Sequence, residues 1–192
     1  MKTVPYSPAE LRRLSQALGE PTWLLEKRLQ ALEAFARFPY PTQKEEAWRY
    51  TDLGQAPLEA PLEEPQGRRL SRDELPKAVR ARLEKTDAAA FLVFLGPDLV
   101  YGEVPEELKA QGVLFTDLRT ALLVHPEKVE GALFQALGLE DKFGAQNAAL
   151  FTHGAFLYVP AGVEVEKPLG VFKVLEKGGV DSVGRSLLVL QD

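Results

Sequence analysis

Leucines recur at helical spacing through the first forty residues. Leu11, Leu14 and Leu18 follow a Ser7–Glu10 capping box, and a second apolar period runs through Trp23–Ala36. Charged residues lie on the other side of that second period: Glu26, Lys27, Arg28 and Glu33. The pattern predicts two amphipathic helices with their apolar faces turned toward a common core.

The middle of the chain alternates between short apolar runs and helical patterns. Ala89–Leu95 is typical of a buried strand, with Leu99–Glu103 as its hairpin partner and Gly112–Phe115 as a third strand. Two further helices are expected over Thr116–Leu123 and Pro126–Leu137. These elements predict a small α/β region.

The pattern changes near residue 144, where short apolar runs follow one another with Pro and Gly between them. The expected strands are Ala155–Val159, Val163–Val165, Leu169–Val174 and Ser186–Leu190, with no helix between them. Such a series is typical of a sandwich, a barrel or a strand solenoid. A solenoid needs about three repeats. The chain has room for barely two, so we expect it to be the N-terminal part of something longer.

The predicted fold class is therefore α+β with two domains. Residues 1–143 form a helical and small α/β domain, and residues 144–192 begin a strand-built core that continues beyond the chain.

Composition and charge narrow the classes of partner. The net charge is −5, so no overall basic footprint predicts binding to nucleic acid. The longest apolar run, Ala88–Leu95, is too short to cross a bilayer, and the N-terminus has no apolar signal region. We expect a cytoplasmic protein with no membrane contact. The sequence has no Ile and a single Asn, which favours a thermophilic source.

The residues that usually carry chemistry are sparse. The chain has no Cys, so it supplies no thiolate nucleophile and no Cys-based zinc or iron–sulfur site. His125 and His153 are isolated in sequence, and neither a HExxH nor a phosphate-binding glycine motif is present. Adjacent Glu45 and Glu46 have the character of solvated surface residues. A Ser-His-Asp set assembled in space remains open. The residues alone predict a scaffold or interaction module, with no catalytic, cofactor-binding or metal-binding residue.

One segment has a distinct charge. Arg68–Lys85 contains seven Lys or Arg residues against three Asp or Glu residues. A solvated helix face explains such a segment most simply, and a site for an anionic partner is the alternative.

Several stretches together resemble one known family. They are KEEAWRYTDL (Lys44–Leu53), the helix before it (Glu20–Thr42), GVLFTDLRTAL (Gly112–Leu122) and the long string from Asp141 to Leu169 that contains NAALF and YVPAGV. In these stretches the chain is similar to the SufB/SufD family of iron–sulfur cluster assembly proteins. The WRYTDL string favours the SufD branch.

The resemblance implies a fold and a role. It implies a helical N-terminal domain followed by a right-handed parallel β-helix, in a complex with SufB and the SufC ATPase or in a homodimer of the full-length chain. It implies a non-catalytic scaffold that binds no cofactor through this part of the chain, the cluster being handled by the whole complex. A SufB-like cluster scaffold and a β-helix enzyme acting on polysaccharide are the alternatives.

The resemblance transfers no functional site residue to this chain. The motif residues to which it points have an expected structural role: Trp48, Arg49, Tyr50, Asn147, Pro160 and Gly162. We expect Trp48 and Tyr50 to bury their rings against the α/β region, with Arg49 paired to a carboxylate, and a contact surface for a partner is the alternative.

Overall fold

The computed structural model describes residues 6–54, 60–176, 178, 180 and 182–192. Met1–Pro5, part of the N-terminus judged above to lack a signal region, lie outside the described residues. The helices are α1 (Pro8–Leu18), α2 (Thr22–Arg37), α3 (Lys77–Lys85), α4 (Glu106–Ala110), α5 (Leu118–Val124), α6 (Pro126–Val129) and α7 (Lys142–Leu150), with short 3₁₀ turns η1 (Glu46–Trp48) and η2 (Arg72–Glu74). The strands are β1 (Ala90–Leu95), β2 (Asp98–Glu103), β3 (Leu114–Asp117), β4 (Ala155–Val159), β5 (Leu169–Val174) and β6 (Leu187–Leu190).

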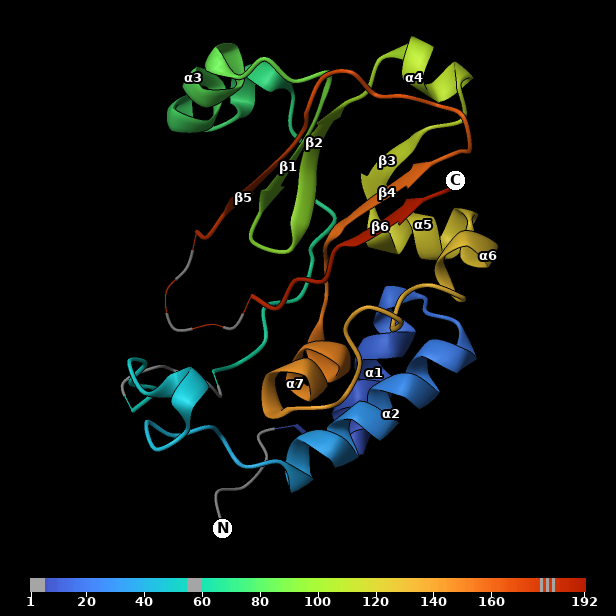
Figure 1. Cartoon of the computed structure of the whole chain (residues 1–192). Coiled ribbons are helices and arrows are strands. Elements are labelled where there is room, and N and C mark those ends of the chain that lie inside the picture. The colour runs from blue at the N-terminus through green and yellow to red at the C-terminus, as the bar shows by residue number, and fades with distance from the viewer. Residues whose placement is uncertain (1–5, 55–59, 177, 179, 181) are drawn as a thin grey trace.

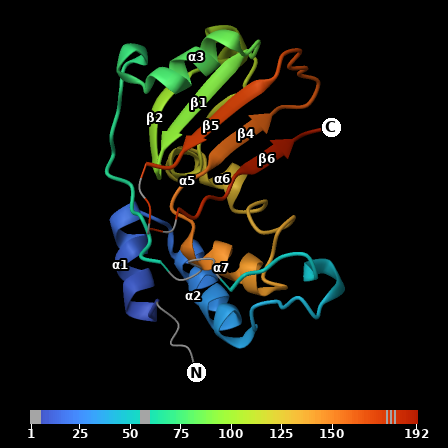
Figure 2. The same ribbon diagram turned by 90° about the vertical axis from the view of Figure 1, so that its left-hand side faces the viewer.

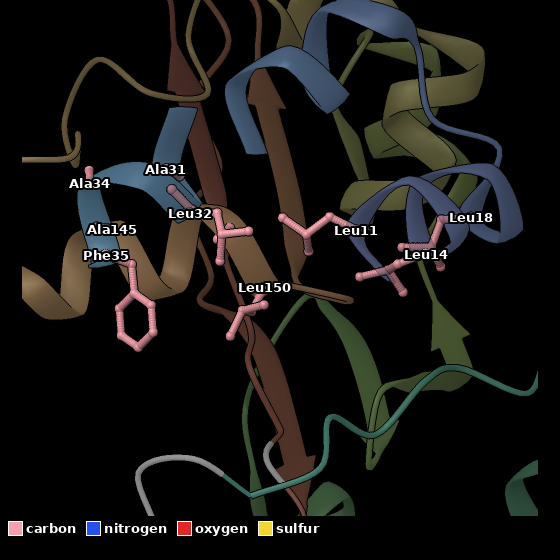
Figure 3. Packing of buried hydrophobic residues seen from close by; sticks show 11 residues of the cluster. Leu11, Leu14, Leu18, Ala31, Leu32, Ala34, Phe35, Ala145 and Leu150 are labelled. Carbon is pink, nitrogen blue, oxygen red and sulfur yellow. The ribbon is translucent and has the colours of Figure 1, made fainter. Parts of the chain in front are cut away.

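Helices α1, α2 and α7 form a layer below the sheets (Figure 1). The Ser7 hydroxyl accepts from the Glu10 amide at the start of α1, and Gly19 ends that helix in the left-handed conformation. Leucines of α1 and the apolar faces of α2 and α7 meet in one buried cluster (Figure 3). The small side chains of Ala145, Ala148 and Ala149 allow α7 to lie close against its neighbours.

The strands form two open three-stranded sheets, in the orders β2-β1-β5 and β3-β4-β6 (Figure 2). Each sheet contains one antiparallel pair, β1–β2 and β3–β4. Each also contains one parallel pair, β1–β5 and β4–β6. Consecutive strands β4, β5 and β6 therefore alternate between the sheets, and β5 and β6 are their respective outer strands.

The sheets enclose one core and are covered on their outer sides. Buried residues of β1 meet residues of β3 and β4 in a cluster between the sheets: Ala90, Leu92, Phe94, Phe115 and Ala155. Alternate residues of β1 pack instead with Val79 and Leu83 of α3. Helix α5 covers the other sheet through Leu118 and Leu122. Strand β1 is buried on both faces, which explains its uninterrupted apolar sequence.

Much of the predicted secondary structure is confirmed. The two N-terminal helices and the β1–β2 hairpin form as expected, and Gly96 in the hairpin loop has φ 55°. The strands predicted at Ala155–Val159 and Leu169–Val174 match β4 and β5. The mixed helix and sheet architecture agrees with the predicted α+β class.

Two predictions are wrong in detail, and one helix was not predicted. Val163–Val165 alternates between half-buried and exposed residues but forms no strand in the described structure, since alternation alone supplies no ladder partner. The helix expected over Pro126–Leu137 ends at Val129, and turns follow around Gly131, a poor helix former. Helix α7 forms just before the first expected strand, in a stretch for which no element was predicted, with Asp141 as its N-cap.

The predicted domain boundary between residues 143 and 144 falls inside α7. The β-helix stays a prediction, because the described strands form two small sheets that are not closed. Across the described ranges, no helix combines the length and apolar character needed to span a bilayer.

Candidate functional site

The motif residues around Trp48 lie on and beside η1. The half-buried Trp48 ring stacks on Phe143 of α7, with ring centroids 5.3 Å apart and an interplanar angle of 27°. Tyr50 is 86% exposed. Arg49 lies between Glu46, at 2.9 Å, and Tyr50, whose hydroxyl accepts a 2.6 Å hydrogen bond. The expected pairing of Arg49 with a carboxylate is confirmed.

The expected burial of both rings is wrong for Tyr50 and only partly right for Trp48. The anchor is α7 rather than the α/β region, because η1 lies beside the start of that helix. Trp48 attaches the segment, and Tyr50 with Arg49 presents an ordered aromatic and cationic surface to solvent.

Asn147 connects α7 to the segment before β6. Its side-chain amide donates to the Gly184 carbonyl at 3.0 Å, and its oxygen accepts from Arg185 at 3.0 Å. The buried Arg185 guanidinium also donates to the Leu133 carbonyl and lies over the Phe134 ring. Burial lowers the pKa of Arg185. The contacts of Asn147 fit its expected structural role.

Pro160 and Gly162 belong to the turn that follows β4. The Val163 amide donates to the Pro160 carbonyl at 3.3 Å, and Gly162 has φ 72°, a conformation that favours glycine. The Pro160 ring also lies against Gly112, two residues before β3. Both residues therefore shape the turn through backbone conformation and packing.

A pocket of about 270 Å³ opens beside the β1–β2 hairpin loop and the start of α5. We call it the His153 pocket. Its polar and charged lining consists of Arg69, Asp98, Asp117, Arg119, Thr120, Thr152 and His153, and Phe94 and Leu123 are among its apolar walls. Strand ends and loops distant in sequence meet here, an arrangement typical of binding sites.

The His153 ring is 6% exposed. Its Nδ1 lies 3.3 Å from the Thr152 hydroxyl, and its ring lies 5.9 Å from the Phe94 ring. Burial lowers the pKa of His153 to about 4, and the positive charge of Lys173 acts in the same direction while Asp98 opposes it. The imidazole is therefore neutral at pH 7.

The remaining candidates do not assemble into a metal or catalytic centre. His125 lies between α5 and α6, and the described residues contain no group of three His, Asp or Glu side chains placed to hold a metal ion. Sequence reasoning missed the pocket because its residues are spread from Pro65 to His153, with no motif spacing to connect them. The sequence did contain one local indication of a site. The polar residues Thr152 and His153, followed by Gly154, lie between an alanine-rich stretch and an apolar strand.

The outer strands of the two sheets expose apolar side chains. Leu188 and Leu190 of β6 are 64% and 68% exposed, and Leu175 after β5 is also exposed. Among the described strands, β5 and β6 each have one ladder partner. Unpaired backbone groups beside exposed leucines are the features of a strand edge that another strand can cover.

The chain matches a known family over most of its length. The model of the SufBD protein N-terminal region matches residues 16–171. The chain belongs to the SufB/SufD family.

Curated relatives carry the same family name. The chain is 32% identical over 190 residues to the iron–sulfur cluster assembly protein SufD of Bacillus subtilis, covering 95% of this chain and 42% of that protein. It is 26% identical over 191 residues to SufB of the same organism, covering 95% of this chain and 40% of that protein. A SufBD family protein of Mycobacterium tuberculosis is 29% identical over 208 residues, covering 97% of this chain and 23% of that protein.

Two conclusions follow for this SufB/SufD family member. It spans less than half the length of these relatives, so the described pocket and strand edges represent only the corresponding part of a SufB/SufD protein. The similar matches to SufD and SufB do not separate the two branches of the family.

Proposed function

We propose that the protein is a SufD-like, non-catalytic subunit of a SufBCD iron–sulfur cluster assembly complex, acting in the cytoplasm with a SufB partner and the SufC ATPase. The observation that carries this proposal is the family match over residues 16–171. The WRYTDL string at Trp48–Leu53 and the SufD relative at 32% identity support the SufD branch.

The strand arrangement supports a β-helical core for the longer protein. Strand β4 pairs in parallel with β6, Phe156 opposite Leu187, while β5 between them joins the other sheet. In one coil of a strand solenoid, the chain forms a strand in one sheet, then a strand in another sheet, and then a strand parallel to the first. The order β4, β5, β6 follows this path. Further coils would cover the exposed leucines of β6, and the resulting stiff arm suits a scaffold.

Co-purification of the full-length protein tests the proposed complex. The tagged protein is co-expressed with the SufB and SufC homologues of the same genome, and an untagged strain serves as the control. Retention of both partners supports the proposal. Retention of SufC without SufB favours a homodimer, and retention of neither contradicts the proposed function.

A SufB-like role is the second candidate, because the SufB relative matches almost the same share of the chain. The 192 residues contain no Cys, so cysteine ligands for a cluster have to come from another part of the full-length protein or from a partner. Anaerobic reconstitution of the separated full-length subunits distinguishes the two roles. Iron and sulfide retained by the SufB subunit alone support the SufD-like role, and a cluster on this subunit alone supports the SufB-like role.

A further inference from the structure

The residues that line the His153 pocket include neither those around Trp48 nor those of the exposed β6 edge, and the proposed scaffold role does not use the pocket. Its two carboxylates are already satisfied within the chain. Asp98 accepts from the Gln66 and Gly67 amides, at 2.8 and 2.7 Å, and from Arg68 at 2.9 Å. Asp117 caps α5 by accepting from the Thr120 amide at 3.0 Å and from its hydroxyl at 2.5 Å.

The arginines of the pocket, unlike Asp98, form no ion pair with any described residue. Arg119, half-buried on the first turn of α5, has no hydrogen bond, ion pair or ring contact with any described residue. Arg69 donates to the Leu99 carbonyl and forms no ion pair within the described structure. Since a guanidinium is always charged and recognises planar or tetrahedral oxyanions, the pocket has unused capacity for an anion.

His153 supplies the second observation. It is more than nine-tenths buried and lines the same pocket as Arg119. Its Nδ1 faces Thr152, and no described residue is hydrogen-bonded to its Nε2. The Thr152 hydroxyl also lies 3.4 Å from the Glu63 carbonyl, which fixes the threonine beside the ring. The ring therefore forms a neutral wall of the pocket beside Arg119, where it is placed to report on what binds there.

We propose that the His153 pocket binds a small oxyanion, a phosphate or a carboxylate group, with Arg119 as its principal cationic contact and the His153 ring as part of the pocket wall. Arg69 contributes positive charge at the rim, and Lys173 contributes it beside His153. The volume of about 270 Å³ accommodates inorganic phosphate or a small phosphorylated or carboxylated molecule.

The chain offers a specific reporter because it contains only two histidines. Proton NMR of the 192-residue chain follows the C2–H signals of His125 and His153, assigned with H125Q and H153Q. Inorganic phosphate is titrated at pH 6.5 and constant ionic strength, and acetate forms a separate arm. We expect a saturable shift of the His153 signal, a rise in its apparent pKa as the anion stabilises the imidazolium, and no change at His125.

Two variants test whether the shift of the His153 signal arises from binding in the pocket. R119Q is expected to weaken the affinity roughly tenfold or more, because it removes a charge-assisted contact. R82Q, at an exposed site on α3 outside the pocket, is the matched control and keeps the original affinity. Unchanged thermal melting and dispersed amide signals in R119Q establish that the fold is intact.

The two arms identify the ligand chemistry. A saturable response to phosphate alone indicates a phosphate group, and a response to acetate alone indicates a carboxylate. No saturable shift at His153 in either arm overturns the proposal. An equal shift at both histidines, or an affinity in R119Q equal to that in R82Q, also overturns it.

Discussion

Arg28 and Lys142 each donate to carbonyls at the end of the other's helix. Arg28 of α2 donates to the Ala149 carbonyl of α7 at 2.8 Å and to the following Phe151 carbonyl at 2.7 Å. Lys142, on the first turn of α7, donates to the Phe35 carbonyl near the end of α2 at 2.7 Å. Carbonyls at a helix C-terminus have no partners within the helix and carry partial negative charge. The two cations therefore fix α2 and α7 in an antiparallel arrangement.

The first prediction concerns this connection. Arg28 is fully buried and paired with Glu20 at 2.5 Å. Replacing it with Met leaves the Glu20 carboxylate without its partner and removes the donors to α7. We expect R28M to lower the free energy of unfolding by about 3–5 kcal/mol, as measured by urea denaturation.

Two further variants show whether the lowered free energy of unfolding of R28M comes from the unpaired Glu20 carboxylate. E20Q/R28M removes both charges and is expected to recover part of the stability. R12Q changes an exposed arginine of α1 and is expected to stay within about 0.5 kcal/mol of the wild type. If R28M is no less stable than R12Q, the buried arginine does not hold the helices together.

Arg28 also shows where the sequence pattern reaches its limit. The helical period correctly predicts α2 and its apolar side, because Leu24, Leu32 and Phe35 recur at the required spacing. It places Arg28 on the solvent side, which is wrong. The residue is buried because α7, more than a hundred residues later, packs over it. Local spacing carries no information about such a distant partner.

The candidate pocket also depends on contacts between segments that are distant in sequence. The β1–β2 hairpin follows from local turn chemistry, and α5 begins close to its predicted position. His153 and Arg119 line the same pocket because β3 and β4 pair with Asp117 opposite Ala155, and no local pattern encodes that pairing. The expected burial of Tyr50 was wrong for a related reason, since aromatic character alone does not specify a covering surface.

The second prediction concerns the close approach of Gly154 to the segment before β6. A Cβ at Gly154 would collide with the backbone carbonyl of Arg185, which is held by the adjacent His153–Gly184 bridge. Because backbone atoms cannot move aside cheaply, we expect G154A to cost about 3 kcal/mol or more. The thermal unfolding midpoint measures the loss. G131A is the control, since a Cβ there meets nothing within 4 Å, and comparable midpoints for the two variants would contradict the tight approach.

The third prediction separates the two rings of the opening motif. We expect W48A to destabilise the chain by about 1–2 kcal/mol, because it removes the stack on Phe143 and half-buried apolar area. Y50A is expected to change stability by less than about 0.5 kcal/mol, since the ring is almost fully exposed. Chemical denaturation of both variants provides the comparison. Equal losses would mean that the segment is held through Tyr50 as well.

The last prediction is a dependence of stability on pH that originates at His153. Its pKa is about 4 in the folded chain against an ordinary value of 6.5, so between these values the unfolded state binds the additional proton. The contribution of His153 is therefore fully present above pH 6.5 and is lost as the pH falls toward 4. The shift corresponds to at most about 3 kcal/mol. Unfolding by urea at intervals from pH 4 to 7.5 measures the dependence.

Carboxylates also titrate at the acid end of this range, so the decisive quantity is the difference between variants. H153Q removes the imidazole and is expected to flatten the curve between pH 5 and 6.5, where Asp and Glu contribute little. H125Q changes a histidine outside the pocket and is expected to retain the wild-type slope. Lys173 and Asp98 act on His153 with opposite signs, so K173M is expected to raise the pKa of His153 toward 6.5 and to make the loss of stability between pH 6.5 and 4 smaller than in the wild type. If H153Q keeps the wild-type slope over that interval, the buried imidazole is not the source of the pH dependence.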